Sequence, residues 1–449
     1  MSLLDRTRAV LPSWLAIYYE DPIEIERGEG RRVWDSQGNA YLDFFGGILT
    51  TMTAHALPEV AKAVSEQAGK VLHTSTLYLV RPAVELAERV AELSGIPDAR
   101  VFFTTSGTEA TDLALLLACC YRRSNQVLAL RNSYHGRSFT AIGVTGNRNW
   151  SATSLSPVQT FYVHGGYRYR SPFRDLPDDE YIAACVADLE DVILTQTAGD
   201  VGAFIAEPVQ GVGGFTMPPD GLLGAFREVL DRHGILWISD EVQTGWGRTG
   251  DTFWGWQAHV PGAAEGRAET VPDLMTFAKG LGNGLSIGGV VARADIMNSL
   301  PANSISTFGG SPVTTAGALA NLDYLLDHDL QANAREVGGW LLGQLRELAA
   351  EQPIVGDVRG KGLMLGVELV RPGTGDPGEP APELANAALE GARRRGLLVG
   401  KGGLHGNVFR IAPPLSLTRS EAEEGFAALA AAIREAGEAA GHEVGGDAS

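Results

Sequence analysis

Long apolar runs, paired cysteines and a secretion signal are missing from this 449-residue chain. No stretch approaches the roughly 18 uninterrupted apolar residues of a membrane-spanning helix, so we expect no membrane association. The first residues, MSLLDRTRAVLPSW, lack both the apolar core and the cleavage site of a signal peptide. Three cysteines (Cys119, Cys120 and Cys185) are too few for a disulfide framework, and they match no metal-site spacing. We therefore expect a cytoplasmic protein that has reduced thiols and no bound metal.

Positive charge is also scarce, and lysine supplies little of it. The formal net charge of −18 argues against nucleic-acid binding, which needs a basic surface facing the phosphates. Only five of the 36 basic residues are lysines, namely Lys62, Lys70, Lys279, Lys361 and Lys401. Lysine, unlike arginine, can lose its proton in a protein and become a nucleophilic amine. A lysine in an apolar, glycine-rich setting is therefore a candidate for chemistry.

Short apolar runs alternate with helical patterns from about residue 55 to residue 320. The clearest apolar runs are 127–130, 201–209, 235–242, 274–279 and 287–292. Nearly continuous apolar strands that alternate with helices indicate a parallel sheet covered on both faces. The sequence therefore predicts an α/β fold with a mainly parallel central sheet, followed by a smaller α+β unit that ends in a helix near 419–436.

A helix start with hydroxyl side chains follows the short apolar run VFFTT. Ser106 and Glu109 have the spacing of a capping box, so we expect a helix to begin here. Together with Gly107 and Thr108, such a start exposes backbone N–H groups that favour an anion such as a phosphate. A plain helix cap explains the same residues, and the segment by itself favours that interpretation.

An acid and a lysine each end an apolar run. Asp240 follows ILWIS, and Lys279 follows LMTFA and precedes Gly-Leu-Gly-Asn-Gly. In a parallel sheet, ligands bind beyond the carboxyl ends of the strands, where Asp240 could hold a proton on a ring nitrogen of a cofactor. Taken alone, an aspartate that caps a turn explains Asp240 better. For Lys279 we favour a functional role, because desolvation lowers the pKa of a lysine and frees its amine to attack a carbonyl.

Three further candidate positions follow or interrupt apolar strands. Tyr134 and His135 follow one strand, and Tyr134 would either stack on a planar ligand or, more simply, pack in the core. Glu207 ends another strand and has a role either in a site or in a turn. Arg410 lies inside an apolar strand, where a buried arginine needs a carboxylate from a substrate or from the protein itself.

Seven motifs occur in a fixed order along most of the chain, and SDEVQTGWGRTG followed by AKG is highly specific. The motifs are SGTEA (106–110), YHG (134–136), AEPVQG (206–211), SDEVQTGWGRTG (239–250), AKGLGNG (278–284), STFGGSP (306–312) and RIAPPL (410–415). Together they resemble the class III (subgroup II) aminotransferases of pyridoxal-phosphate fold type I, from about residue 15 to residue 435. YLDFFGGI and LHTSTLY look most similar to the alanine–glyoxylate aminotransferase 2-like branch.

The resemblance implies a bound pyridoxal 5'-phosphate cofactor. Lys279 would form the aldimine with this cofactor and move protons, and Asp240 would keep its ring nitrogen protonated. Tyr134 and Val242 would pack on the two faces of the ring, and Gln243 would approach its phenolic oxygen. The other cofactor-binding residues that the resemblance implies are Ser106, Gly107, Thr108, His135, Glu207 and Thr307.

The resemblance also implies how the substrate and a second subunit bind. Arg410 would clamp the substrate carboxylate with two hydrogen bonds, and Tyr19 would help to shape the substrate pocket. Gly107 and Thr108 would hold the phosphate, and Thr307 would reach the phosphate of the partner subunit. The protein would therefore be a homodimer, and two dimers could pair into a tetramer.

We predict four segments along the chain. Residues 1–54 belong to the small domain and the dimer contact, and residues 55–320 form the large cofactor-binding domain. Residues 321–436 form the rest of the small domain, and 437–449 form a flexible tail. Within the first segment, the residues Ser36-Gln37-Gly38-Asn39 predict the turn of a hairpin.

Two positions depart from the pattern of the family. Val212 stands where some members have a glutamate, which screens the carboxylate-binding arginine when an ω-amino group reacts. This chain therefore lacks the glutamate that lets those members alternate between ω-amino donors and glutamate-type acceptors. Ala54 stands where relatives have a glycine before the histidine, which alters a turn and affects no catalytic residue.

The sequence therefore predicts an aminotransferase. It would move an amino group from an amino acid or amine donor to a 2-oxo acid such as pyruvate or glyoxylate. The same fold also serves decarboxylases, aminomutases and phospho-lyases that use pyridoxal phosphate, and these remain the alternative. A non-catalytic binding protein is a third hypothesis. Lys279, Asp240 and Gln243 together argue against it, because binding alone needs no nucleophile.

Overall fold

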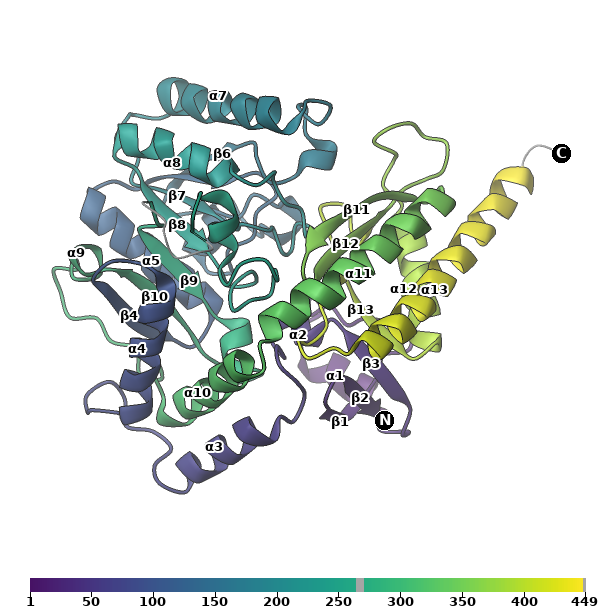
Figure 1. Cartoon of the computed structure of the whole chain (residues 1–449), viewed down its shortest axis with the longest axis horizontal. Coiled ribbons are helices and arrows are strands. Elements are labelled where there is room, and N and C mark those ends of the chain that lie inside the picture. Colours follow the sequence, from purple (N-terminus) through teal and green to yellow (C-terminus); the bar gives the residue numbers. More distant parts are fainter. Residues whose placement is uncertain (264–269, 447–449) are drawn as a thin grey trace.

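The computed structural model describes residues 1–263 and 270–446. Two seven-stranded sheets lie next to each other, and each is covered by its own helices (Figure 1). The first sheet is built from the middle of the chain, and the second joins strands from both ends of the chain. The fold is thus α/β with a large and a small domain, as the sequence predicts.

The large sheet has the strand order β4-β10-β9-β8-β7-β5-β6. Its pairs are parallel from β9 to β6, and only β10 runs antiparallel to its neighbours. The bounds are β4 (Ala99–Thr104), β5 (Gln126–Leu130), β6 (Gln159–Val163), β7 (Ala203–Ala206), β8 (Leu236–Asp240), β9 (Leu274–Phe277) and β10 (Gly288–Arg293). The mainly parallel sheet is therefore confirmed.

Helices cover both faces of this sheet because its strands are apolar on both sides. Successive residues of a strand point to opposite faces. In β5, Val127 joins a core cluster with α5 (Gly107–Arg122), whereas Leu128 joins the cluster with α7 (Asp178–Gln196) and α8 (Leu222–His233). The other helices of this domain are α3 (Pro58–Ala68), α4 (Arg81–Ser94), α6 (Phe139–Gly143), α9 (Ala294–Met297) and α10 (Pro312–Asp327).

The small sheet has the order β1-β2-β3-β13-β14-β12-β11. Its only parallel pair within the described residues is β3 with β13, which joins the N-terminal hairpin to the C-terminal strands. The strands are β1 (Ile25–Glu29), β2 (Arg32–Asp35), β3 (Ala40–Phe44), β11 (Val355–Lys361), β12 (Met364–Leu369), β13 (Leu397–Gly402) and β14 (Val408–Ile411). The helices are α1 (Leu3–Val10), α2 (Gly46–Leu49), α11 (Leu330–Glu351), α12 (Pro382–Arg394) and α13 (Arg419–Gly446).

Two boundaries differ from the sequence prediction. The last helix, predicted to end near residue 436, continues to Gly446, although four of the ten added residues are glycines, which disfavour a helix. Residues 447–449 of the predicted tail lie outside the described residues. The predicted domain boundary after residue 320 falls within α10, whose Ala320 and Tyr324 pack with α3 of the large domain. The chain turns from α10 into α11 of the small domain at Asp329, the N-cap of α11.

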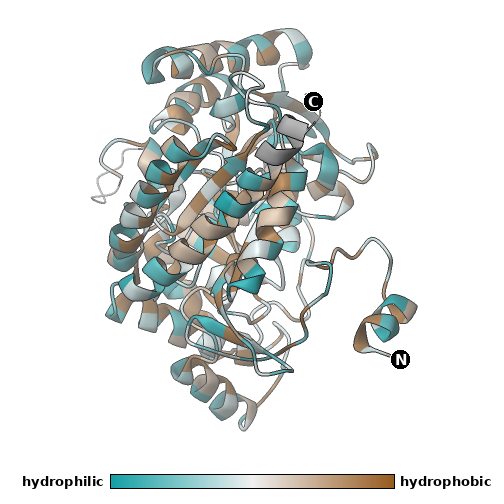
Figure 2. Ribbon diagram, turned by 90° about the vertical axis from the view of Figure 1, so that its right-hand side faces the viewer, coloured by the Kyte–Doolittle hydropathy of each residue, from teal (hydrophilic) through white to brown (hydrophobic). Residues whose placement is uncertain are grey.

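Helix α1 has no buried residue, and Figure 2 shows it standing away from the two sheets. In the part of the chain that the structure describes, no helix is long and apolar enough to span a membrane. Cys119, Cys120 and Cys185 are unpaired. Localisation stays a prediction.

Candidate active site

A cavity of about 410 Å³ opens at one edge of the large sheet. Because β5, β7, β8 and β9 are parallel neighbours, their carboxyl ends meet there. Glu207, Asp240 and Lys279 lie at the carboxyl ends of three of these strands, and all line the cavity. Its lining consists of Thr50, Thr105, Ser106, Gly107, Thr108, Tyr134, His135, Gly136, Glu207, Asp240, Val242, Gln243, Ala278, Lys279, Gly284, Leu285, Ser286 and Ile287.

The N-terminus of α5 forms one wall of the cavity. Ser106 caps the helix and accepts a hydrogen bond from the Glu109 N–H at 3.2 Å. The Glu109 carboxylate accepts hydrogen bonds from the N–H and the hydroxyl of Thr105, at 2.6 and 2.7 Å. It does not accept the backbone N–H of Ser106 that a complete capping box requires. A Cβ added to Gly107 would lie 3.1 Å from Val242 Cγ1, so a larger residue here would require Val242 to shift. The helix start can hold an anion through its free N–H groups.

Asp240 is fixed in the floor of the cavity. Its Oδ2 lies 2.7 Å from His135 Nδ1, and its Oδ1 accepts from the Val242 N–H at 3.1 Å. Both Asp240 and His135 are almost completely buried. A carboxylate held in this way keeps its orientation, and in a buried site it favours a positive charge or a proton on a ring nitrogen opposite it.

Glu207 ties two loops of the cavity together. Its carboxylate accepts from the Tyr134 N–H at 2.9 Å and from the Gly211 N–H at 2.8 Å. Burial raises the pKa of Glu207 to about 7, although these N–H donors and the neighbouring His135 oppose the rise. The acid thus fixes the positions of Tyr134 and Gly211.

Lys279 is suited to act as a nucleophile. Burial lowers the pKa of Lys279 to about 8, assisted by the charge of Arg410 and opposed by Asp240 and Glu207. No hydrogen-bond partner of its amine is found among residues 1–263 and 270–446. Its φ of +42° lies in the left-handed region, which residues other than glycine seldom adopt and which is typical of functional positions. A substantial fraction of this amine is neutral near pH 8.

Arg410 is buried in β14 without an acidic partner in the described part of the protein. Its Nη1 donates to the Gly211 carbonyl at 3.4 Å and its Nη2 to the Lys401 carbonyl at 3.3 Å, while its Nε has no partner. The guanidinium lies over the rings of Phe45 and Phe215, with its Cζ 4.8 and 5.8 Å from their centroids. Burial lowers the pKa of this arginine. A buried guanidinium with an unpartnered Nε and no acid beside it is able to bind a carboxylate from outside.

The structure brings most of the predicted site residues together, but not all of them. Every predicted cofactor-binding residue lines the cavity except Thr307, which is exposed on the loop before α10. The two predicted substrate-binding residues, Tyr19 and Arg410, do not line it either, and the Tyr19 ring lies 5.5 Å from Arg393 Cζ. Sequence reasoning missed the cavity residues Thr50 and Ser286, for which no motif gave a signal.

The residues present fit pyridoxal phosphate. This cofactor offers an aldehyde, a ring nitrogen, a phenolic oxygen and a phosphate. The cavity offers an amine at Lys279, a carboxylate at Asp240 and a helix N-terminus at Gly107. The Gln243 side chain lines the cavity with its Oε1 buried and without a partner, as expected where a ligand completes the contacts. Among the described residues no cluster of side chains could hold a metal ion.

Comparison with known proteins agrees with this geometry. A model of the class-III aminotransferase family matches residues 17–433. The alanine–glyoxylate aminotransferase 2 homolog 2, mitochondrial, of Arabidopsis thaliana is 38% identical over 428 residues, which cover 94% of this chain and 85% of the relative. An (S)-enantioselective omega-transaminase from Thermomicrobium roseum superimposes with a TM-score of 0.87 at 35% identity, covering 97% of this chain and 98% of the other.

A further solved structure is an amine transaminase from an uncultivated Pseudomonas species in its pyridoxal-phosphate-bound form. It has a TM-score of 0.86 and 31% identity, and covers 95% of this chain and 98% of the other.

Similar proteins also include enzymes of other reactions. The alanine/serine racemase of Pyrococcus horikoshii is 33% identical over 445 residues, covering 96% of this chain and 90% of the relative. A phospholyase from Arthrobacter, solved with phosphoethanolamine, has a TM-score of 0.85 and 31% identity, and covers 96% of this chain and 99% of the other. The fold is therefore shared by enzymes of several reactions.

Proposed function

The chain belongs to the class-III aminotransferase family, and from this premise we propose that it moves an amino group from an α-amino acid to a small 2-oxo acid such as pyruvate or glyoxylate. It is a pyridoxal-phosphate-dependent aminotransferase. The choice of acceptor is supported by the alanine–glyoxylate aminotransferase 2 homologue among its relatives. The observation that carries the proposal is the buried guanidinium of Arg410, whose charge acts on Lys279 and which has no carboxylate partner among the described residues.

Each residue of the site has a definable task. When bound, the cofactor supplies an aldehyde that reacts with amines and a protonated ring that accepts electrons from the substrate. Lys279 provides a neutral amine, which holds the cofactor and later carries a proton to or from the α carbon of the substrate. Asp240, oriented by His135, keeps the ring nitrogen protonated. The start of α5 binds the phosphate through the N–H groups near Gly107 and the Thr108 hydroxyl.

Arg410 selects substrates that carry a carboxylate next to the reacting carbon. Its planar guanidinium can bind both oxygens of such a group, and its buried surroundings strengthen the contact. Val212, on the neighbouring loop, is buried and apolar and supplies no competing charge. No carboxylate among the described residues pairs with Arg410. The guanidinium therefore stays available to bind the substrate carboxylate in both half-reactions.

We also propose that the protein is a homodimer. Large apolar side chains remain exposed on the segments around residues 72–79 and 305–308, where His73 and Phe308 rings lie 4.9 Å apart. Leu79 is fully exposed and Phe308 is 63% exposed. A patch of this kind marks an interaction site, and Thr307 lies within it, far enough from its own cavity not to line it. In a homodimer Thr307 would face the phosphate of the partner subunit.

The direct test is product analysis by mass spectrometry with L-alanine and glyoxylate. The proposal predicts pyruvate and glycine in equal amounts from the wild-type enzyme and neither from Lys279→Ala. Formation of D-alanine without pyruvate would favour the racemase chemistry of one relative, and release of phosphate from phosphoethanolamine would favour the phospholyase chemistry of another.

A further inference from the structure

The segment Gly211–Gly214, here called the glycine loop, lies with Gly211 next to the cavity residue Gln243 and with Gly214 next to Arg359 and Gly403 of the small domain. Arg410 Nη1 donates to the Gly211 carbonyl at 3.4 Å, and the Gly214 N–H donates to the same oxygen at 3.2 Å. The Gly211 N–H in turn donates to Glu207 at 2.8 Å. The position of this loop therefore fixes one contact of Arg410 and one contact of Glu207.

Three groups outside the cavity hold the glycine loop in place. The Gly403 N–H donates to the Val212 carbonyl at 3.0 Å, and Asn132 Nδ2 donates to the Gly213 carbonyl at 3.1 Å. The Gly214 carbonyl receives the strongest support, because Arg359 donates to it with both Nε, at 3.0 Å, and Nη2, at 2.9 Å. Gly214 has a φ of +101°, and a Cβ there would lie 3.1 Å from Arg359 Nη2, so glycine is required for this contact.

Glu368 holds Arg359 in this position. Its side chain is fully buried in β12, and one oxygen accepts from Arg359 Nη1 at 2.9 Å. Asp357 also accepts from this Nη1, at 2.5 Å. Arg359 thus uses one edge of its guanidinium for the acids and the other edge for the Gly214 carbonyl.

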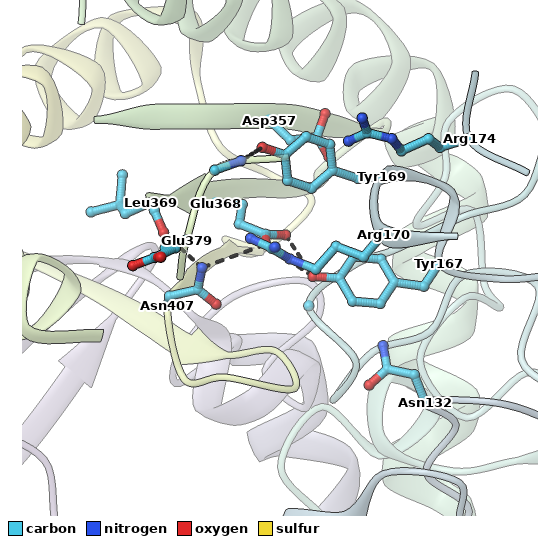
Figure 3. A network of polar contacts seen from close by, with 12 residues as sticks. Asn132, Tyr167, Tyr169, Arg170, Arg174, Asp357, Glu368, Leu369, Glu379 and Asn407 are labelled. Atoms are coloured by element: carbon cyan, nitrogen blue, oxygen red, sulfur yellow. Dashed lines mark hydrogen bonds and ion pairs between the residues drawn. The ribbon is translucent and has the colours of Figure 1, made fainter. Parts of the chain in front are cut away.

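Glu368 also connects the two domains. Arg170 Nε donates to it at 2.7 Å and the Tyr167 hydroxyl at 2.9 Å, both from the large domain. Figure 3 shows Tyr167 and Arg170 converging on Glu368, with Asn407 on its other side. Burial opposes the charge of Glu368, but the two arginines outweigh it and lower its pKa below the ordinary value. The carboxylate is therefore ionised and anchored from several directions.

We propose that Arg359, held by Glu368, is a positioning residue for the substrate carboxylate: it fixes the glycine loop through the Gly214 carbonyl, and the loop fixes Arg410. This inference rests on the proposed role of Arg410 as the carboxylate-binding residue. Arg359, like Arg410, does not line the cofactor cavity, and it is linked to Arg410 through the glycine loop. The network thus transmits the placement of the small domain to the substrate site.

The test is the single-turnover reaction of the holoenzyme with L-alanine, followed by the change in cofactor absorbance. Arg359→Lys keeps a positive charge beside Glu368 but cannot offer two N–H groups to one carbonyl. We expect the apparent dissociation constant of L-alanine to rise about tenfold, while the maximal rate constant stays within about twofold. Glu368→Gln is the second variant. We expect it, too, to raise the apparent dissociation constant and to leave the maximal rate constant nearly unchanged. Arg174→Lys is the matched control, because Arg174 pairs with the exposed Asp376 nearby and does not contact the glycine loop.

The Arg410→Met background separates this inference from the proposed function. We expect Arg410→Met to weaken L-alanine binding, and Arg359→Lys to add less than about twofold to that loss, because the two residues act in one chain of contacts. If Arg410→Met weakens binding but Arg359→Lys and Glu368→Gln leave it unchanged, the inference is wrong and the proposed function stands. Full additivity of the two substitutions, or a fall in the rate constant alone, would also contradict the inference. No effect of Arg410→Met overturns both.

Discussion

At the scale of single residues, the site depends on a lysine that the protein keeps partly neutral. Burial of Lys279 favours the free amine, which is what attack on an aldehyde requires. The same burial penalises the charged form of the folded protein. Catalytic readiness and stability are therefore opposed at this one position.

This opposition predicts a pH-dependent gain in stability for Lys279→Met in the cofactor-free enzyme. The folded-state pKa of Lys279, about 8, lies below its ordinary value of 10.5, so the penalty is complete below pH 8 and vanishes as the pH rises toward 10.5. We expect a gain on the order of 2 kcal/mol at pH 7, measured by thermal and chemical unfolding. Lys62→Met, at an exposed lysine, is the control and should change little. An equal or lower stability of Lys279→Met at pH 7 would contradict the assignment.

A second prediction concerns the charge of Asp240. Asp240→Asn keeps the shape of the side chain beside His135 but removes the negative charge that keeps the cofactor ring protonated. We expect kcat to fall by about 10²–10³-fold in steady-state assays, with cofactor still bound. Asp220→Asn removes a carboxylate that pairs with Lys361 and does not line the cavity, and it serves as the control. A kcat within about threefold of wild type would refute this role of Asp240.

At the scale of elements, the parallel strands explain why the site could be located from the sequence. Apolar runs that end in Glu207, Asp240 and Lys279 predict three strands whose carboxyl ends share one edge of a sheet, and the structure has this arrangement. The contact between His135 and Asp240 could not be predicted, because it joins residues 105 positions apart through the tertiary fold. The partners of Arg410 stayed open for the same reason.

The loop after β8 gives a third prediction. Glu241 is fully buried there, and its carboxylate accepts from the N–H groups of Gly255 and Trp256 and from the hydroxyls of Ser239 and Thr244. Glu241→Ala leaves these donors without a partner, so we expect a loss of about 3 kcal/mol in the free energy of unfolding. Glu228→Ala, on the exposed side of α8, should change it by less than about 0.5 kcal/mol. An equal effect of both substitutions would show that Glu241 does not organise this loop.

At the scale of the whole molecule, the sequence predicts the two-domain arrangement better than it predicts where individual helices and domains end. The apolar periodicity is strong in the sheets, whereas helix ends depend on weak local preferences, so α13 extends past its predicted end. Contacts with a second subunit leave no periodic signal in one chain. Thr307 does not line its own cavity, so its proposed role depends on the proposed homodimer.

The proposed homodimer predicts that a charge in the exposed apolar patch dissociates it. Phe308→Asp places a carboxylate where the side chain is 63% exposed in the single chain and would be buried in a dimer. We expect the variant to be monomeric by light scattering after size-exclusion chromatography, and to bind the cofactor more weakly. Leu194→Asp, at an exposed residue of α7 outside this patch, is the control. A wild-type protein that is monomeric at micromolar concentration would contradict the proposal.

The central claim is that Lys279 is the residue that binds the cofactor covalently. Borohydride reduction of the purified holoenzyme makes the bond between lysine and cofactor permanent, and peptide mapping by mass spectrometry then locates it. With only five lysines in the chain, each can be assigned unambiguously. We expect the cofactor on Lys279 and on no other lysine, and a label on Lys62, Lys70, Lys361 or Lys401 instead would contradict the role of Lys279.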